Sequence, residues 1–296
     1  MPALDAPDPP RATGAPPCLT IAGSDPSGGA GMQADLKTFA AAGAYGMGAL
    51  TVATDCTTRS GVDEVRALEP AFVRHQIDRV AGDVAPTGVK TGMLFSQAII
   101  RTVARAAREH GWGKDAQTPF VVDPVMTTRA GERLLSDGAE GAMREALLPL
   151  ATVATPSLPE AERLTGRDVR SRRAMRQAAE KILDLGAEAV VVTGGHLGAG
   201  EPAVDLLLDA DGKAWLEAER VPRTVRGAGD AFSAALAAGL AEGHALREAA
   251  ERAKTYVTGA IRHAPERSGS GAGRPLWHEW QRFVEEAGNA AAPAGA

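Results

Sequence analysis

The 296-residue chain has little of several things that mark specialised classes of protein. Cysteine occurs twice, at Cys18 and Cys56, and aromatic residues make up 4% of the chain. Two cysteines without metal-ligand spacing exclude a disulfide framework and a zinc module, and they fit a reducing compartment. No apolar run approaches the length of a membrane span, and the acidic, proline-rich start is unlike a signal peptide. We therefore expect a cytoplasmic protein that does not act on membranes.

Positive charge is not in excess either. The formal net charge is −5, and the chain has neither arginine runs nor interleaved aromatic residues, so nucleic acid is not an expected partner. An apolar content of 44% and a charged content of 23% are ordinary for a globular protein, and the length suffices for a full core. These values suit an enzyme with a small-molecule substrate.

Both ends of the chain are expected to be disordered. Residues 1–17 include six prolines, and residues 287–296 are almost only Ala, Gly, Asn and Pro, so neither end can bury enough apolar surface to offset the entropy of ordering. We set the tail at 284–296. No linker, repeat or shift in composition interrupts residues 18–283, which predicts one domain.

Short apolar runs alternate with helical patterns through that domain. This alternation predicts an α/β fold with a mostly parallel central sheet and helices on both faces. Residues 203–218 are instead expected to form a hairpin that turns at Asp209–Gly212. The expected strands are 19–22, 47–54, 88–90, 120–122, 152–154 and 189–192, and the expected helices are 29–42, 70–81, 97–109, 137–147, 171–185, 229–242 and 246–262.

The most informative stretch is Arg226-Gly-Ala-Gly-Asp-Ala-Phe232, where a glycine turn leads into a helical pattern. Backbone amides of Gly227, Ala228 and Gly229 at the start of a helix would form an anion hole for a phosphoryl group. Asp230 beside them could take a proton from an alcohol, and together they suit phosphoryl transfer. The plainer alternative is a helix start with an aspartate cap.

A second glycine-rich segment, residues 23–31, follows the first expected strand. It matches neither a P-loop nor a dinucleotide-binding turn, so it is either a capped loop or a place where the backbone approaches a ligand. In the next helix, Asp35 lies on the apolar face of Met32 and Phe39, where an unpaired charge is costly. A ligand role for Asp35 is favoured, and capping of loop amides is the alternative.

Further polar groups follow the ends of expected strands, where ligands gather in an open parallel sheet. Asp123 and Glu160 come after two such strands and could hold Mg²⁺ through waters, or they could simply favour the N-terminus of a helix. Thr193 and Gly195 belong to a glycine turn that suits phosphate oxygens. His196 in the same turn is more typical of an ordinary loop histidine.

These residues resemble the hydroxymethylpyrimidine/phosphomethylpyrimidine kinases of thiamine biosynthesis. The resemblance runs in order from about residue 19 to 262, and its first block is highly specific. It implies a ribokinase-like three-layer sandwich, ATP and Mg²⁺ as phosphoryl donor and cofactor, and a homodimer. The matching segments are Leu19–Phe39, Gly43–Gly46, Lys90–Leu94, Val121–Met126, Thr155–Ala161 and Gly194–His196.

Carried over position by position, the resemblance implies a role for each candidate residue. The pyrimidine pocket falls on Gly23, Asp35, Thr54, Cys56 and Met93, with Asp35 accepting hydrogen bonds from the aminopyrimidine. Phosphates would meet the Gly227–Gly229 turn and the nucleotide-binding residues Thr193 and Gly195, while Asp123 and Glu160 would serve the metal.

The chain departs from the family pattern at several of these positions. Asp230 replaces the usual cysteine, and an aspartate is already ionised at neutral pH whereas a thiol must be activated. Cys56 replaces a glutamine that could both donate and accept hydrogen bonds to the heterocycle. Ser157 and Thr193 replace the usual Asn and Lys, and one residue is inserted near Ser60.

Three functions therefore compete. The first is ATP-dependent phosphorylation of 4-amino-5-hydroxymethyl-2-methylpyrimidine and then of its monophosphate. The second keeps this chemistry with pyridoxal or pyridoxine as acceptor, which Asp230 and Cys56 favour. The third is a non-catalytic pyrimidine-binding regulatory module, which the intact base and glycine turn disfavour.

Overall fold

The computed structural model describes residues 14–56, 62, 64–128, 131–195, 197–198, 202–266, 273–282 and 284. Most of the two ends that we expected to be disordered lies outside these residues. The first strand begins at Pro17, one residue before the expected start of the domain. Within the described segments, no helix is both long and apolar enough to cross a membrane.

A largely parallel sheet forms the middle of the molecule. Its strands are β1 (Pro17–Ala22), β2 (Tyr45–Leu50), β5 (Gly88–Thr91), β6 (Phe120–Val122), β7 (Val153–Ala154), β8 (Val190–Gly194), β9 (Ala203–Asp209) and β10 (Gly212–Ala218). The order across the sheet is β10-β9-β8-β7-β6-β5-β1-β2. All pairs from β2 to β8 are parallel, and β9 and β10 form the expected antiparallel hairpin at one edge. The central strands are buried on both faces, which explains their continuous apolar runs.

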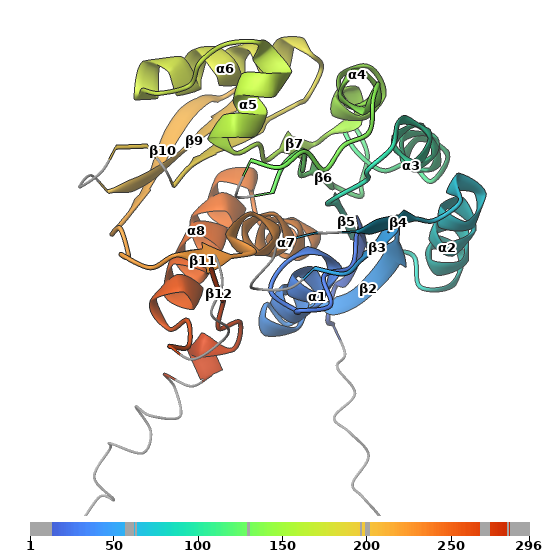
Figure 1. Cartoon of the computed structure of the whole chain (residues 1–296), viewed down its shortest axis with the longest axis horizontal. Coiled ribbons are helices and arrows are strands. Elements are labelled where there is room, and N and C mark those ends of the chain that lie inside the picture. Colours follow the sequence, from blue (N-terminus) through green and yellow to red (C-terminus); the bar gives the residue numbers. More distant parts are fainter. Residues whose placement is uncertain are drawn as a thin grey trace, which may run out of the picture.

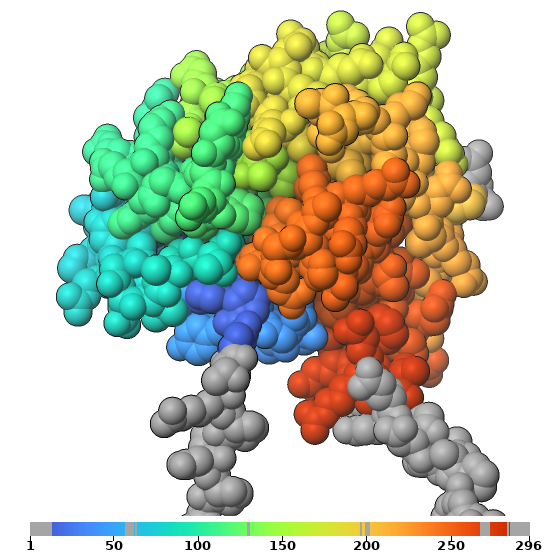
Figure 2. All heavy atoms as spheres, turned by 180° about the vertical axis from the view of Figure 1, so that it is seen from behind, coloured from blue at the N-terminus to red at the C-terminus, as the bar shows by residue number. Residues whose placement is uncertain are grey.

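Helices cover both faces of the sheet (Figure 1). One face packs against α2 (Pro70–Asp83), α3 (Gln97–Glu109), α4 (Ala139–Ala142), α5 (Leu158–Thr165) and α6 (Arg172–Asp184). The other packs against α1 (Gly31–Ala41), α7 (Ala228–Ala241) and α8 (Leu246–Arg262). Figure 2 shows the reverse side, with the orange residues of α7 and α8 at its centre. The three-layer sandwich predicted from the sequence is therefore confirmed.

One sequence expectation about strands is wrong. The run 47–54 is not a single strand, because the chain leaves the central sheet at Thr51. The Thr51 backbone amide donates to the Ala22 carbonyl, and its hydroxyl donates to the Met93 carbonyl. The next strand, β3 (Val52–Thr54), pairs instead with β4 (Val65–Ala67) as a small antiparallel flap. Hydrophobicity runs through Thr51 unbroken, so only these tertiary contacts mark the division.

The short pair β11 (Val225–Arg226) and β12 (Arg274–Pro275) was also not expected, because two-residue strands leave no periodic pattern. Conversely, only the first part of the expected helix 137–147 is a regular α-helix, which ends at Ala142. The chain continues through a π-helical turn at Met143–Leu147 and a 3₁₀ turn at Leu148–Leu150.

Close packing between β5 and α7 fixes the helix that begins at the glycine turn. A Cβ atom on Gly88 would lie 2.8 Å from the Ala241 Cβ and 2.9 Å from the Ala237 carbonyl oxygen. Only glycine at this position lets α7 approach the sheet so closely. The position of α7 in turn determines where the first residues of the helix, including Asp230, lie.

We predict that Gly88→Ala lowers the free energy of unfolding by about 1–3 kcal/mol, because the added methyl group overpacks the interface between α7 and the sheet. Gly82→Ala is the matched control, since a Cβ there meets no atom within 4 Å and Gly82 lies inside α2. That control should be neutral or stabilising by up to about 1 kcal/mol. Denaturant unfolding measures both, and equal effects of the two substitutions would contradict the close approach.

Candidate functional site

The two glycine-rich segments of the sequence meet in space. Gly227 has a left-handed backbone with φ of +76°, and a Cβ there would lie 2.1 Å from the carbonyl oxygen of Gly29. Gly31 is also left-handed, and its Cβ would lie 2.6 Å from the Gly23 carbonyl oxygen. Both positions need glycine for conformation and for space. The expected anion hole and the expected ligand loop are therefore adjoining walls of one site.

Asp230 lies in the first turn of α7, directly after this junction. Gly227 is the N-cap of the helix, so Ala228, Gly229 and Asp230 occupy its first three positions, where amides have no partner within the helix. Gly229 is exposed and Asp230 is half-buried, so both are open to a ligand. An anion next to these amides would be stabilised, and a carboxylate would lie at its side.

The carboxylate of Asp35 is not free, and its partners are internal. The Lys90 Nζ donates to one oxygen and the Thr20 hydroxyl donates to the other, each at 2.6 Å. All three side chains are completely buried. Burial raises the pKa of Asp35 to about 6 even though Lys90 opposes the shift, and the nearby charge of Asp230 raises it further. The suggested capping of loop amides is not what Asp35 does.

Its expected hydrogen bonds to an aminopyrimidine remain a prediction. Each carboxylate oxygen keeps a lone pair beyond the bond that it already accepts, so the internal partners do not consume its full capacity. A ligand would meet a carboxylate that Lys90 and Thr20 hold in a fixed orientation.

Lys90 is the counter-charge of a wider group of acids. Burial lowers its pKa, but the charges of Asp35, Asp230 and Asp123 outweigh this effect, so that the pKa of Lys90 is raised overall. An ammonium on the central strand β5 therefore stays protonated with no exposure to water. It stabilises carboxylates from α1, α7 and the end of β6 at the same time.

Asp123 and Glu160 lie near each other, as their positions at neighbouring strand ends predicted. Burial raises the pKa of Asp123 well above its usual value, and the charge of Glu160 adds to the shift while Lys90 opposes it. Burial also raises the pKa of Glu160 against its hydrogen bonds to Ser157. One oxygen of Asp123 accepts from the Ser233 hydroxyl on α7 at 2.8 Å. Two buried acids with raised pKa values, one of them raised partly by the charge of the other, favour a cation between them.

Glu160 also has the structural role that the sequence left open. Its carboxylate accepts from the backbone amide and the hydroxyl of Ser157, which completes a capping box at the start of α5. In the part of the chain that the structure describes, no three His, Cys, Asp or Glu side chains form a group suited to a metal ion. Any ion here would thus depend on water or phosphate oxygens for much of its coordination.

The structure brings together three residues of the expected acceptor pocket, Gly23, Met93 and Thr54. A Cβ on Gly23 would lie 2.7 Å from Val52 and 3.5 Å from Met93, so only glycine lets the loop pack this closely against the flap. The Thr54 hydroxyl donates to the Ser24 carbonyl at 2.8 Å, and it accepts from the Cys56 amide at 3.3 Å. The flap strand β3 is thereby attached to the glycine loop.

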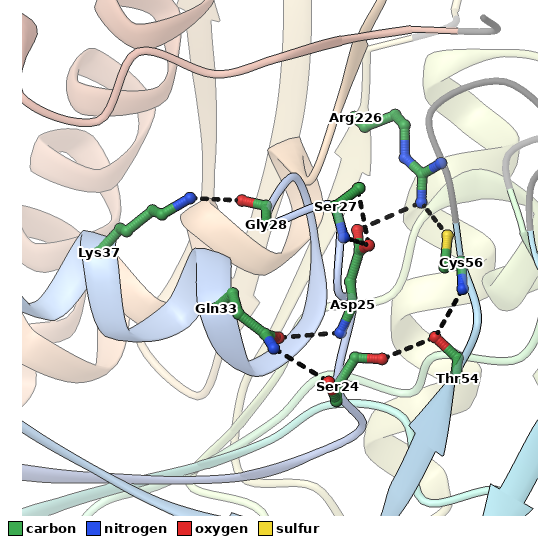
Figure 3. A network of polar contacts seen from close by, with 9 residues as sticks. All are labelled: Ser24, Asp25, Ser27, Gly28, Gln33, Lys37, Thr54, Cys56 and Arg226. Atoms are coloured by element: carbon green, nitrogen blue, oxygen red, sulfur yellow. Dashed lines mark hydrogen bonds and ion pairs between the residues drawn. The ribbon is translucent and has the colours of Figure 1, made fainter. Parts of the chain in front are cut away.

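Cys56 does not stand alone in this pocket. The Arg226 guanidinium contacts its sulfur at 2.7 Å and the Asp25 carboxylate at 3.3 Å (Figure 3). The other oxygen of Asp25 accepts from the amide and hydroxyl of Ser27. Arg226, the residue directly before Gly227, therefore links the flap to the glycine loop. Burial raises the pKa of Cys56 although the bond to Arg226 lowers it, so the thiol stays protonated at neutral pH.

Thr193 and Gly195 lie farther along the same edge of the sheet. Thr193 is in β8 and forms a parallel bridge with Ser157, the partner of Glu160. Gly195 is exposed, and its carbonyl accepts from Arg220 at 2.6 Å. A nucleotide bound here would have its phosphates near the two acids. His196 and Ser60 lie outside the described residues.

Sequence reasoning missed Lys90, Thr20 and Arg226 as site residues. A lysine inside an otherwise apolar strand was a usable signal for Lys90, because a buried ammonium requires an acid partner. Thr20 shares the face of Lys90 in the parallel register of β1 and β5. Arg226 gave no such signal, since its partners are about 170 and 200 residues away along the chain.

We predict that Lys90→Met destabilises the protein by about 3–5 kcal/mol at about pH 8, because a buried carboxylate loses its partner. The loss should shrink towards about pH 5. A carboxyl whose folded pKa is raised gives stability that is present below its unfolded pKa and lost as pH rises through the folded value. Without Lys90 the pKa of Asp35 would rise above about 6. Towards pH 5, Asp35 would therefore be protonated in the variant, and the destabilisation would be smaller.

Unfolding free energies of both proteins across this pH range provide the measurement. Lys37→Met, on the exposed side of α1, is the matched control and should show no such pH dependence. A loss for Lys90→Met that is constant with pH would contradict the assigned pairing.

Comparison with known proteins agrees with this geometry. Residues 25–275 match the family model described as phosphomethylpyrimidine kinase. The hydroxymethylpyrimidine/phosphomethylpyrimidine kinase of Streptomyces coelicolor is 44% identical over 94% of this chain and 98% of its own length. The thiamine biosynthesis bifunctional protein ThiED of Geobacter sulfurreducens is 44% identical over 83% of this chain, which spans about half (49%) of that longer protein.

A solved structure gives the same result for the fold. The ADP complex of Bacillus subtilis pyridoxal kinase superposes with a TM-score of 0.81 at 38% identity, covering 91% of this chain and 99% of that one. The ribokinase-like architecture expected from the sequence is thus confirmed. The chain belongs to the phosphomethylpyrimidine kinase family and is a phosphotransferase.

Proposed function

We propose that the protein transfers a phosphoryl group from ATP to the hydroxymethyl group of 4-amino-5-hydroxymethyl-2-methylpyrimidine, and then a second one to the resulting monophosphate. The observation that supports this proposal most is the contact of Gly227 with Gly29, because it brings the turn before Asp230 against the glycine-rich loop 23–31. The curated relatives of similar length support the choice of acceptor.

In the first transfer, Asp230 takes the proton of the attacking hydroxyl. The oxygen then bonds to the γ-phosphorus of ATP while the bond to the β-phosphate bridge breaks, and ADP leaves. Amides of Gly227, Ala228 and Gly229 stabilise the charge on the transferred group, which is the main catalytic task in such a loose transition state. Thr193 and Gly195 would hold the phosphates of the nucleotide, and the ADP complex of the related pyridoxal kinase supports a nucleotide donor.

Asp123 and Glu160 fit a divalent cation that accompanies the nucleotide. Both are buried and repel each other, and the hydroxyl of Thr155, directly after β7, is buried without a hydrogen-bond partner among the described residues. Oxygen ligands of this kind suit Mg²⁺, which keeps several waters and binds through one or two carboxylates plus phosphates. The ion would offset the charge of the donor phosphates.

Pyridoxal is the second candidate acceptor. The solved pyridoxal kinase of Bacillus subtilis shares the fold, and the Cys56 thiol bound to Arg226 offers a heterocycle weaker hydrogen bonds than an amide would. The family model and the 44% identity to the Streptomyces coelicolor pyrimidine kinase keep the hydroxymethylpyrimidine first. A regulatory module without activity is disfavoured, because a pure binder needs neither a base nor an anion hole. A cytoplasmic homodimer belongs to the proposal as well, and light scattering tests the dimer.

Production of ADP with Mg²⁺ against a panel of acceptors tests the proposed substrate. The panel holds hydroxymethylpyrimidine, its monophosphate, pyridoxal, pyridoxine and ribose. The two pyrimidines should give the highest kcat/KM values. A higher value for pyridoxal would indicate a kinase of vitamin B6 salvage instead. No turnover with any acceptor would support the non-catalytic binding module.

We predict that Asp230→Asn lowers kcat for the hydroxymethylpyrimidine by roughly 10²-fold or more, the size expected for loss of a positioned base. ATP should still bind with similar affinity by calorimetry, since the amides of the turn remain. Asp211→Asn, at the exposed hairpin turn, is the control for loss of one negative charge. Near-normal turnover of Asp230→Asn would show that Asp230 is not the base.

A further inference from the structure

Arg226 occupies the boundary between the acceptor pocket and the anion hole. Its guanidinium lies between Asp25 and Cys56, and the residue directly precedes the turn that begins at Gly227 (Figure 3). The side chain is 17% exposed, so it is mostly shielded but reachable from the pocket. The backbone of the same residue is held in β11 by its pairing with β12. The cation is therefore placed firmly at the point where an acceptor would meet the transferred phosphoryl group.

The two proposed transfers make different electrostatic demands on this point. In the first, a neutral hydroxyl attacks and must lose a proton. In the second, the attacking group is a phosphate that is already mostly ionised at neutral pH, because its second pKa is about 6. It needs no base, but it brings negative charge towards another anion and towards Asp230. A fixed cation on the acceptor side would remove that repulsion.

Within the described segments, two lysines near the glycine loop are each bound to another group. Lys90 is completely buried and bound to Asp35. Lys37 donates to the Gly28 carbonyl at 2.7 Å, and the glycine loop lies between it and Arg226 (Figure 3). Arg226 presents a planar fork of donors that suits a phosphate better than an ammonium does.

We propose that Arg226 is the residue that binds the acceptor's own phosphate and so makes the second transfer possible. This inference rests on the proposed function. An oxygen of the acceptor phosphate bonds to the γ-phosphorus of ATP as the bond to the β-phosphate bridge breaks, ADP leaves, and no proton needs to be removed. Arg226 thus serves the second transfer, whereas Asp230 serves the first as a base.

The test compares kcat/KM for the monophosphate with kcat/KM for the unphosphorylated hydroxymethylpyrimidine in each variant. Arg226→Gln should lower the ratio of the two values by roughly 30-fold or more, as expected for loss of a charged group that acts on one substrate only. Asp230→Asn should shift the ratio in the opposite direction. Arg226→Lys should restore part of the ratio, and Lys37→Gln, which removes a cation from the outer side of the same loop, should leave it unchanged.

Asp25→Asn separates a direct role from a structural one. It weakens the tie between Arg226 and the glycine loop but keeps the cation, so it should not lower the ratio. Titration calorimetry with the monophosphate should show weaker binding for Arg226→Gln and a smaller dependence on salt. The inference is overturned if Arg226→Gln lowers both kcat/KM values equally, or if Asp25→Asn lowers the ratio as much as Arg226→Gln does. A wild-type protein that phosphorylates hydroxymethylpyrimidine but not its monophosphate overturns this inference while the first transfer stands, and one that phosphorylates neither overturns both.

Discussion

The buried ammonium of Lys90, inside the central sheet, is the charge on which the arrangement of the site depends. It lies 2.6 Å from Asp35, and its field also acts on Asp123. Burial alone would favour neutral forms of these groups, because a charge in a dry interior is costly. With Lys90 protonated, acids from different layers remain close together. Removing one of these charged side chains would leave the charge of another without a partner in the interior. The stabilities contributed by Lys90 and the acids are therefore strongly coupled.

The fold supplies the remaining geometry through backbone rather than side chains. Parallel strands deliver Asp123 and the residues after β7 and β8 to one edge of the sheet, where ligands gather in open α/β folds. Glycines then let two loops and a helix start approach more closely than any side chain would permit. In the proposed function, the Gly227–Gly229 turn would therefore lie between the acceptor on one side and the nucleotide on the other. Phosphoryl transfer needs this order, because donor and acceptor must meet in line.

Much of this could be predicted from the sequence. Most strands, the hairpin and most helices could be predicted from apolar runs and periodicity, and the glycine turn before Asp230 predicted the start of α7. The specific motif around Gly23 and Asp35 gave the family. The division at Thr51 and the pairing of β3 with β4 could not be predicted, because they depend on contacts with Ala22 and Met93 that leave no local pattern.

The partners of the site residues were equally hidden. Asp35 on an apolar helix face signals that a partner exists but does not say which one. The sequence favoured a ligand for Asp35, which stays a prediction, and the structure adds Lys90 and Thr20 as its internal partners. The bridge from Arg226 to Cys56 and Asp25 joins three segments that are distant along the chain, so only the folded structure reveals it.

The ionisation of Asp35 is the most direct measure of the role assigned to Lys90. Carbon-13 NMR of protein labelled at the aspartate carboxyl carbons follows this titration residue by residue, with Asp35→Asn identifying the resonance. The midpoint should lie near 6 in the wild type, and it should move upward when Lys90 is replaced by Met. A midpoint at the ordinary aspartate value of about 4, unchanged by the substitution, would contradict a buried pair that governs the site.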